Sequence, residues 1–163
     1  MKKTTEDKLL LVQVLCARLP YGVHVQHITT QISGTLHDIT SYPLYNKDSN
    51  IYDIKAVTNF FGECDYVYLE YFKPYLFPLR NITEQQVKEI VNLVWPGVKC
   101  DVYLDIEEPE VDIEFNDCTS SYLLSEIDSL GYKVIDYLNA HHFDYRGLIE
   151  KGLAIDAIGK NIY

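Results

Sequence analysis

The sequence predicts an α+β fold, in which a small SH3-like β-barrel or curled antiparallel meander packs with about four helices and an acidic β-hairpin. Three observations lead to this prediction. Short segments within residues 21–79 are rich in β-branched and aromatic residues, which favour strands. Residues 5–18 and 81–95 place apolar side chains at helical spacing. Residues 102–116 alternate apolar and polar positions on either side of a turn, which is typical of a hairpin.

Length and composition predict one compact domain over residues 1–163. The barrel-like lobe covers residues 21–79, and residues 80–163 carry a helix, the acidic hairpin and the C-terminal helices. Forty-seven per cent of the residues are hydrophobic, which suits a packed core and is too apolar for a disordered chain. The net charge of −10 argues against direct binding to nucleic acid or to an anionic membrane surface, because both depend on Lys and Arg.

The first helix is predicted over residues 5–18. Glu6 and Asp7 suit its first turn, where a carboxylate meets the positive end of the helix dipole. Pro20 ends the helix, because proline disfavours helical geometry in the residue before it. One apolar face should be buried, and it consists of Leu11, Val12, Leu15, Cys16 and Leu19.

Four strands are predicted in the lobe, over residues 21–30, 31–40, 51–58 and 65–72. Gly34 in the second strand indicates a sharp bend or a bulge. The next segment, residues 73–78, contains two prolines. We expect it to lie outside any central strand, because proline donates no ladder hydrogen bond.

Three helices are predicted in the second half of the chain. The clearest covers residues 81–95, where Thr83 begins a capping box. Apolar residues return to helical spacing over residues 120–141, and Gly131 could split this helix in two. A last short helix is expected over residues 145–150.

The cysteines predict a reduced protein in the cytoplasm. Cys16, Cys64, Cys100 and Cys118 are far apart in the sequence and form no C-x-x-C pair, so neither a zinc ribbon nor a thioredoxin-type motif is indicated. We expect mostly buried thiols. The apolar run at residues 9–16 is not interpreted as a signal peptide, because acidic residues precede it and no small-residue cleavage site follows. No cofactor is predicted.

The segment from Asp101 to Asp117 contains eight carboxylates and no Lys or Arg. The plain interpretation is a solvated face of the hairpin. The first alternative is a docking surface for a basic protein, or a mimic of a phosphate backbone. A calcium site is the second alternative, although the segment contains no EF-hand pattern. The candidate binding residues are Asp105, Glu107, Asp112 and Glu114.

Tyrosine is abundant, with 14 residues in the chain, and seven of them lie between residues 42 and 75 of the predicted lobe. Tyrosine provides rigid contact area with a polar tip, which suits an interface. The alternative is the ordinary preference of aromatic residues for strands. Tyr66 and Tyr68 should face opposite to Val67 and Leu69, and they are the candidate protein-binding residues of the lobe.

His141, His142 and Asp144 are the candidates for a metal site or a catalytic site. Adjacent residues of a helix point about 100° apart, so one ion cannot easily take both histidines. The H-E-x-x-H spacing is absent. The favoured interpretation is structural, with one histidine packed and the other hydrogen-bonded at a helix end. No metal site is predicted.

Three motifs are similar to those of one protein family. They are LCARLPYGV at residues 15–23, KPYLFP at residues 73–78 and LNAHHFDYRGLI at residues 138–149. Together they resemble a family of short proteins from gut anaerobic bacteria and their phages. The resemblance implies a cytosolic bacterial or prophage-encoded protein, and it assigns no catalytic residue.

These observations favour a non-enzymatic protein-interaction module, with the tyrosine-rich and acidic segments as its contact surfaces. Two alternatives remain open. One is an acidic mimic of nucleic acid that binds a basic protein. The other is a metal-dependent enzyme that uses His141, His142 and Asp144.

Overall fold

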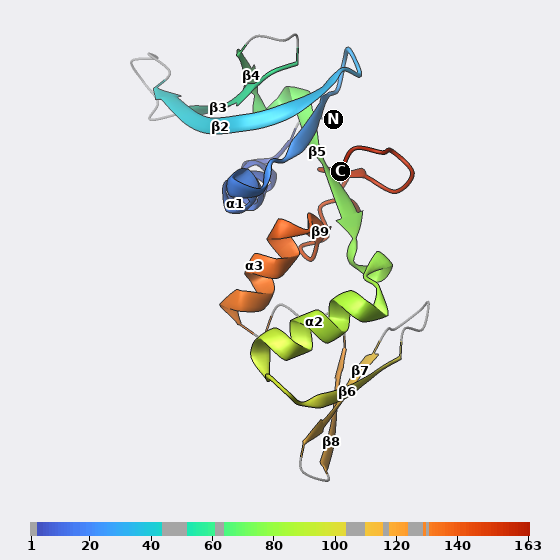
Figure 1. The fold of residues 1–163 in the computed structure, drawn as a ribbon. Coiled ribbons are helices and arrows are strands. Elements are labelled where there is room, and N and C mark those ends of the chain that lie inside the picture. The colour runs from blue at the N-terminus through green and yellow to red at the C-terminus, as the bar shows by residue number, and fades with distance from the viewer. Residues whose placement is uncertain are drawn as a thin grey trace. The chain divides into compact units, whose positions relative to one another are not determined.

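The computed structural model describes residues 3–43, 52–60, 64–103, 110–115, 118–123, 129 and 131–163. These residues form three α-helices, an open seven-stranded sheet and a separate three-stranded sheet (Figure 1). The predicted α+β class is confirmed, and the described part of the chain holds three helices where about four were expected. The chain divides into two compact units. Unit 1 is Met1–Leu76 with Gly147–Tyr163, and unit 2 is Phe77–Arg146.

Unit 1 contains one helix, α1 (Thr5–Arg18), and most of the larger sheet, in the order β10-β5-β1-β2-β3-β4. The strands are β1 (His24–His27), β2 (Ser33–Pro43), β3 (Tyr52–Thr58), β4 (Asp65–Tyr68), β5 (Phe72–Pro78) and β10 (Ile155–Asp156). Neighbours pair antiparallel, except that β10 runs parallel to β5. Within the described residues the order ends at β4 without closing. The sheet is therefore open, and the barrel form of the prediction is wrong. Strands β1 to β4 follow one another in the antiparallel order of a meander, which was the alternative prediction.

Strand β5 also corrects the expectation that its prolines keep it out of the sheet. Pro74 lies opposite Val25 of β1. The N–H of Ile28 donates to the carbonyl of Tyr71 at 2.7 Å. Bonded and non-bonded pairs alternate along an antiparallel ladder, so Val25 and Pro74 form a non-hydrogen-bonded pair. The N–H that Pro74 lacks would point toward β10, whose pairing begins only at Tyr75. Pro74 therefore occupies a central strand without the loss of a ladder hydrogen bond.

The glycine expected to mark a bulge has a different role. The register of β2 against β3 shifts between Leu36 and Asp38, and Gly34 lies outside this bulge. A Cβ atom at Gly34 would lie 3.0 Å from both the Asn59 Oδ1 atom and the Phe60 Cδ1 atom. The side chain is absent because the neighbouring segment passes too close.

Helix α1 occupies the range predicted from the sequence. Thr4 accepts the N–H of Asp7, and the Asp7 carboxylate accepts the N–H of Thr4, which makes a complete capping box. The buried face follows the i, i+3, i+4, i+7 pattern and consists of Leu11, Val14, Leu15 and Arg18. Cys16 lies off this stripe and is exposed, as is Cys64. The expectation of mostly buried thiols is wrong for these two cysteines.

The C-terminal segment completes the core of unit 1. Leu148, Leu153 and Ala154 are buried against α1 and the sheet. The short helix predicted over residues 145–150 does not form, and the segment turns instead. Gly147 has a φ of 69°, a left-handed conformation that interrupts a right-handed helix.

Tyr163 ties this segment to the sheet. Its hydroxyl donates to the Tyr75 carbonyl at 2.9 Å and accepts the N–H of His24 at 3.1 Å. The Tyr163 ring meets the His24 ring edge-on, with centroids 5.1 Å apart. Burial of the phenol raises the pKa of Tyr163 to about 12.

We expect the free energy of unfolding to fall as the pH rises from about 10, the pKa of an unfolded tyrosine, to about 12. A group whose pKa is higher in the folded state than in the unfolded state stabilises the fold at pH values below its unfolded-state pKa. This contribution is lost as the pH rises through the folded-state pKa. Because 45% of Tyr163 is exposed, solvent screening limits the effect to about 1 kcal/mol. Urea unfolding of the wild type and Tyr163→Phe across this range measures it. Parallel pH profiles for the two proteins would contradict it.

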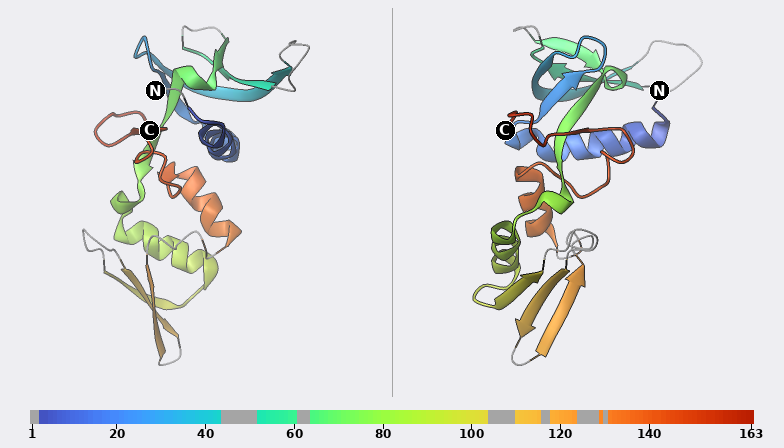
Figure 2. Two further views of the ribbon diagram at one scale, coloured as in Figure 1. Left: turned by 180° about the vertical axis from the view of Figure 1, so that it is seen from behind. Right: turned by 90° about the vertical axis from the view of Figure 1, so that its right-hand side faces the viewer.

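Unit 2 contains the remaining helices and the smaller sheet. Its elements are α2 (Glu84–Val94), β6 (Lys99–Tyr103), β7 (Glu110–Phe115), β8 (Cys118–Leu123), α3 (Tyr132–Ala140) and β9 (Phe143–Asp144). The smaller sheet is antiparallel in the order β6-β7-β8, and Figure 2 shows it next to α2. β9 pairs in parallel with the end of β5, at Phe77 and Pro78. The predicted capping box is confirmed, because Thr83 and Gln86 exchange both hydrogen bonds.

Strand β8 corrects the helix predicted over residues 120–141. Its residues pair with β7 from Leu123, opposite Glu110, to Cys118, opposite Phe115. A third strand is favoured here because an isolated two-stranded hairpin is only marginally stable. The helical part of the prediction survives in α3, which begins directly after Gly131.

Candidate functional site

Aromatic side chains gather where the sheet of unit 1 ends, at β4 and the 3-10 turn Leu69–Tyr71 that follows it. We call this group the tyrosine surface, and it consists of Tyr66, Tyr68, Tyr71, Lys55 and His27. Tyr66 is 56% exposed and Tyr71 is 48% exposed. Two of the three tyrosines therefore offer about half of their surface to solvent.

The strand register explains the outward direction of two of these tyrosines. Val67 of β4 lies opposite the fully buried Ala56 of β3, so the Val67 side chain is on the side of the sheet that faces the core. Tyr66 and Tyr68 belong to the other side, as predicted from the sequence. Tyr71 would lie on the same side as Val67 if the strand continued, because the two positions are four residues apart. The 3-10 turn interrupts the strand period, and Tyr71 is exposed instead.

Contacts among four members of the tyrosine surface hold their side chains in place. The rings of Tyr68 and Tyr71 meet edge-on, with centroids 6.2 Å apart. The ammonium of Lys55 lies 4.5 Å from the centroid of Tyr68. His27 stacks on Tyr71 with centroids 6.4 Å apart. Aromatic pairs and cation–π contacts each contribute about 0.5–1 kcal/mol at exposed sites, so the surface is partly ordered in advance.

The acidic candidates fall in two places. Asp105 and Glu107 lie outside the described residues. Asp112 and Glu114 belong to β7. The register places Asp112 opposite Asp101 and places Glu114 opposite Lys99 of β6. The predicted hairpin pairing of residues 102–116 is confirmed for its described part, and this part holds one like-charge and one opposite-charge register pair.

The two histidines have separate structural environments. His141 follows α3 and is exposed, and its Nδ1–H donates to the Tyr137 carbonyl at 2.9 Å. His142 is buried, and its backbone carbonyl accepts the N–H of Phe77 at 2.9 Å. This outcome confirms the expectation of one packed histidine and one at a helix end. Asp144 is buried in β9. Across the part of the chain that the structure describes, no three His, Cys, Asp or Glu side chains are grouped to hold a metal.

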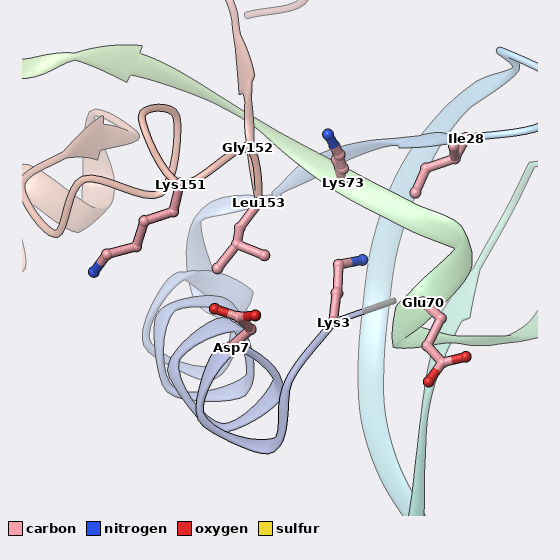
Figure 3. Close-up of a pocket in the computed structure, with 8 residues that line it drawn as sticks. All are labelled: Lys3, Asp7, Ile28, Glu70, Lys73, Lys151, Gly152 and Leu153. Carbon is pink, nitrogen blue, oxygen red and sulfur yellow. The ribbon is translucent and has the colours of Figure 1, made fainter. Parts of the chain in front are cut away.

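A small cavity of about 120 Å³ opens in unit 1, between the start of α1, β5 and the C-terminal segment (Figure 3). Its charged lining residues are Lys3, Asp7, Glu70, Lys73 and Lys151. No sequence pattern indicated this cavity. Its lysines lie about seventy residues apart along the chain, so no motif spacing connects them.

Lys3 occupies the most distinctive position in this cavity. Its ammonium donates to the carbonyls of Leu69 and Phe72, the latter at 3.0 Å. Burial, followed by the charge of Lys73, lowers the pKa of Lys3 to about 8. A partly neutral lysine at the wall of a cavity is an amine that can act as a nucleophile.

The chain has no match among family models, curated proteins or solved structures. None of the helices in the described ranges combines the length and the apolar character needed to cross a bilayer.

Proposed function

We propose that this protein is a non-enzymatic protein-interaction module that binds an extended segment of a partner protein along β4 and the tyrosine surface. The observation that carries the proposal is the coincidence of a sheet edge with exposed aromatic side chains. No described strand pairs with the outer side of β4. Such an edge presents backbone N–H and C=O groups that can add one more strand.

The side chains beside this edge suit peptide recognition. Tyrosine has few rotatable bonds, so it contributes a large contact area at a low cost in conformational entropy. Tyr66 and Tyr71 supply exposed ring faces, and Lys55 adds a positive charge beside Tyr68. Backbone bonds along β4 would provide affinity, the aromatic rings would select apolar side chains of the partner, and Lys55 would favour an acidic one.

The acidic segment supports a second proposal, a surface for a basic protein that would make the chain a mimic of nucleic acid. Eight carboxylates without Lys or Arg from Asp101 to Asp117, and the register pair of Asp101 with Asp112, favour it. A chain that did not need this surface for binding would avoid like charges opposite each other in a ladder, because such pairs destabilise it by several tenths of a kcal/mol. Binding of this kind should weaken steeply with added salt.

We infer that the protein acts in the cytoplasm and is of bacterial or prophage origin. The motif resemblance supports the origin. The cysteines support the compartment, because Cys16 and Cys64 are exposed free thiols, a state that a reducing environment maintains.

Selection of peptides from a displayed random library, followed by titration of the enriched peptides, tests the main proposal. Replacing both Tyr66 and Tyr71 with serine should weaken binding at least tenfold, a loss of about 1.4 kcal/mol or more. Tyr132→Ser is the matched control, because Tyr132 is 79% exposed and lies in unit 2. Unchanged affinity in the double variant would reject the tyrosine surface. Loss of binding in Asp112→Asn with Glu114→Gln instead would favour the acidic surface.

A further inference from the structure

Lys73, which lines the cavity of unit 1, has no ionic partner among the residues that the structure describes. Glu70 pairs with Lys8 at 2.5 Å, and Asp7 accepts the N–H of Thr4 within the capping box. Both carboxylates of the lining are therefore engaged. Within the described residues, no carboxylate lies at ion-pairing distance from Lys73. In a protein with a net charge of −10, this is an unusual place for an uncompensated positive charge.

Lys3 is oriented by its two acceptors. Its side chain reaches from the start of α1 toward β5, and Figure 3 shows it between Lys73 and Glu70. A neutral amine has two N–H groups and one lone pair. When both N–H groups donate to the carbonyls of Leu69 and Phe72, the lone pair is directed away from these acceptors. An electrophile that enters the cavity can then meet the lone pair.

We propose that this cavity is a binding and reaction site for small 2-oxo acids, in which the Lys3 amine forms an imine with the keto carbon while the Lys73 ammonium binds the carboxylate. The nitrogen lone pair attacks the carbonyl carbon, and a C=N bond replaces the C=O bond. The carbonyl oxygen leaves as water with the two amine hydrogens, so no oxidant or reductant is needed. Protonation of the imine restores one N–H, which can keep one of the two carbonyl bonds.

The size and the protonation state of the site suit this chemistry. A volume of about 120 Å³ corresponds to about four water molecules at ~30 Å³ each, enough for an acid of a few carbon atoms. The pKa of about 8 leaves roughly a fifth of the Lys3 side chains neutral near pH 7.4, whereas an ordinary lysine is less than about 1% neutral. Lys73 and Lys8 favour the neutral amine, and Glu70 and Asp7 oppose them with smaller effects than burial.

Reductive trapping of the full-length protein tests the proposal. Pyruvate is added with cyanoborohydride, which reduces the imine to a stable secondary amine, and peptide mass mapping measures the rate at each lysine. Fragmentation of the N-terminal peptide distinguishes Lys3 from the α-amine. Lys3 should react at least tenfold faster than Lys160, an exposed lysine of the same unit. Pyruvamide, which has the same ketone without the carboxylate, should react at Lys3 at least fivefold more slowly than pyruvate.

Two variants separate the two roles. Lys3→Arg keeps a positive charge that can donate to both carbonyls but cannot form the imine, so labelling at that position should disappear. Lys73→Gln should lower the pyruvate-to-pyruvamide rate ratio at Lys3 to about one. A rate at Lys3 equal to that at Lys160, or equal rates with the two ketones, would overturn the proposal. Both ratios are measured on the wild type, so the test stands even where a variant fails to fold.

Discussion

Leu138→Ala should destabilise unit 2 by about 2–5 kcal/mol and leave the protection of unit 1 against hydrogen exchange nearly unchanged. Leu148→Ala should destabilise unit 1 by a similar amount and leave the protection of unit 2 nearly unchanged. Both leucines have an exposed fraction of 0%, so each truncation removes fully buried apolar surface and leaves a cavity. Leu138 packs in the core that α2 and α3 share. Leu148 packs in the core of α1 and the larger sheet. Because each unit has its own core, each loss should be local.

Native-state hydrogen exchange measures this separation, because it reports opening free energies residue by residue. Amides of α2 and α3 should exchange faster in Leu138→Ala, while those of β1 and β5 should keep their wild-type rates. Leu93→Ala is a suitable control, because Leu93 is 38% exposed and its truncation should cost less than about 1 kcal/mol. Equal acceleration in both units would show that the chain unfolds as one cooperative body.

Gly34→Val should cost about 1–3 kcal/mol, which is the usual range for overpacking. The first added atom would lie 3.0 Å from Asn59 Oδ1 and 3.1 Å from the backbone nitrogen of Phe60. The Asn59 oxygen cannot withdraw without loss, because it accepts the N–H of Thr35 at 2.6 Å. The backbone nitrogen of Phe60 can move only with the main chain that follows β3. Thermal unfolding of Gly34→Ala and Gly34→Val should show a loss that increases with side-chain size.

A double-mutant cycle with Asn59→Ala identifies the cause of the loss. Removing the Asn59 amide leaves room for the new side chain, so Gly34→Ala should cost less in that background than in the wild type. If Gly34→Ala has the same cost in both backgrounds, crowding by Asn59 is not the reason for the glycine.

Local signals in the sequence predicted the helices that depend on them. The capping box at Thr83 and the acidic first turn of α1 act within a few residues, and both helices form where they were expected. The alternation of Tyr66 and Val67 likewise gave the correct sides of β4. In each case the responsible contacts lie within one turn or one strand.

Contacts between distant segments were beyond sequence reasoning. Pro74 is tolerated in a central strand because β10, eighty residues later, begins to pair only at Tyr75. Residues 118–123 form β8 because β7 offers a ladder, although the apolar spacing that leads into α3 suggested a helix. The cavity around Lys3 needs four stretches of the chain that only the fold brings together.

Unit 2 begins at Phe77 in β5 and ends at Arg146, shortly after β9, and Phe77 is paired with Phe143 of β9. Unit 2 therefore forms one continuous piece of chain that leaves and returns at nearly the same place, whereas unit 1 is assembled from two pieces. For protein engineering, this makes residues 77–146 a cassette. We expect it to tolerate exchange for another folded insert whose own termini are adjacent. Closing the gap in unit 1 then needs only a short linker, because the entropy of closing a loop rises slowly with its length.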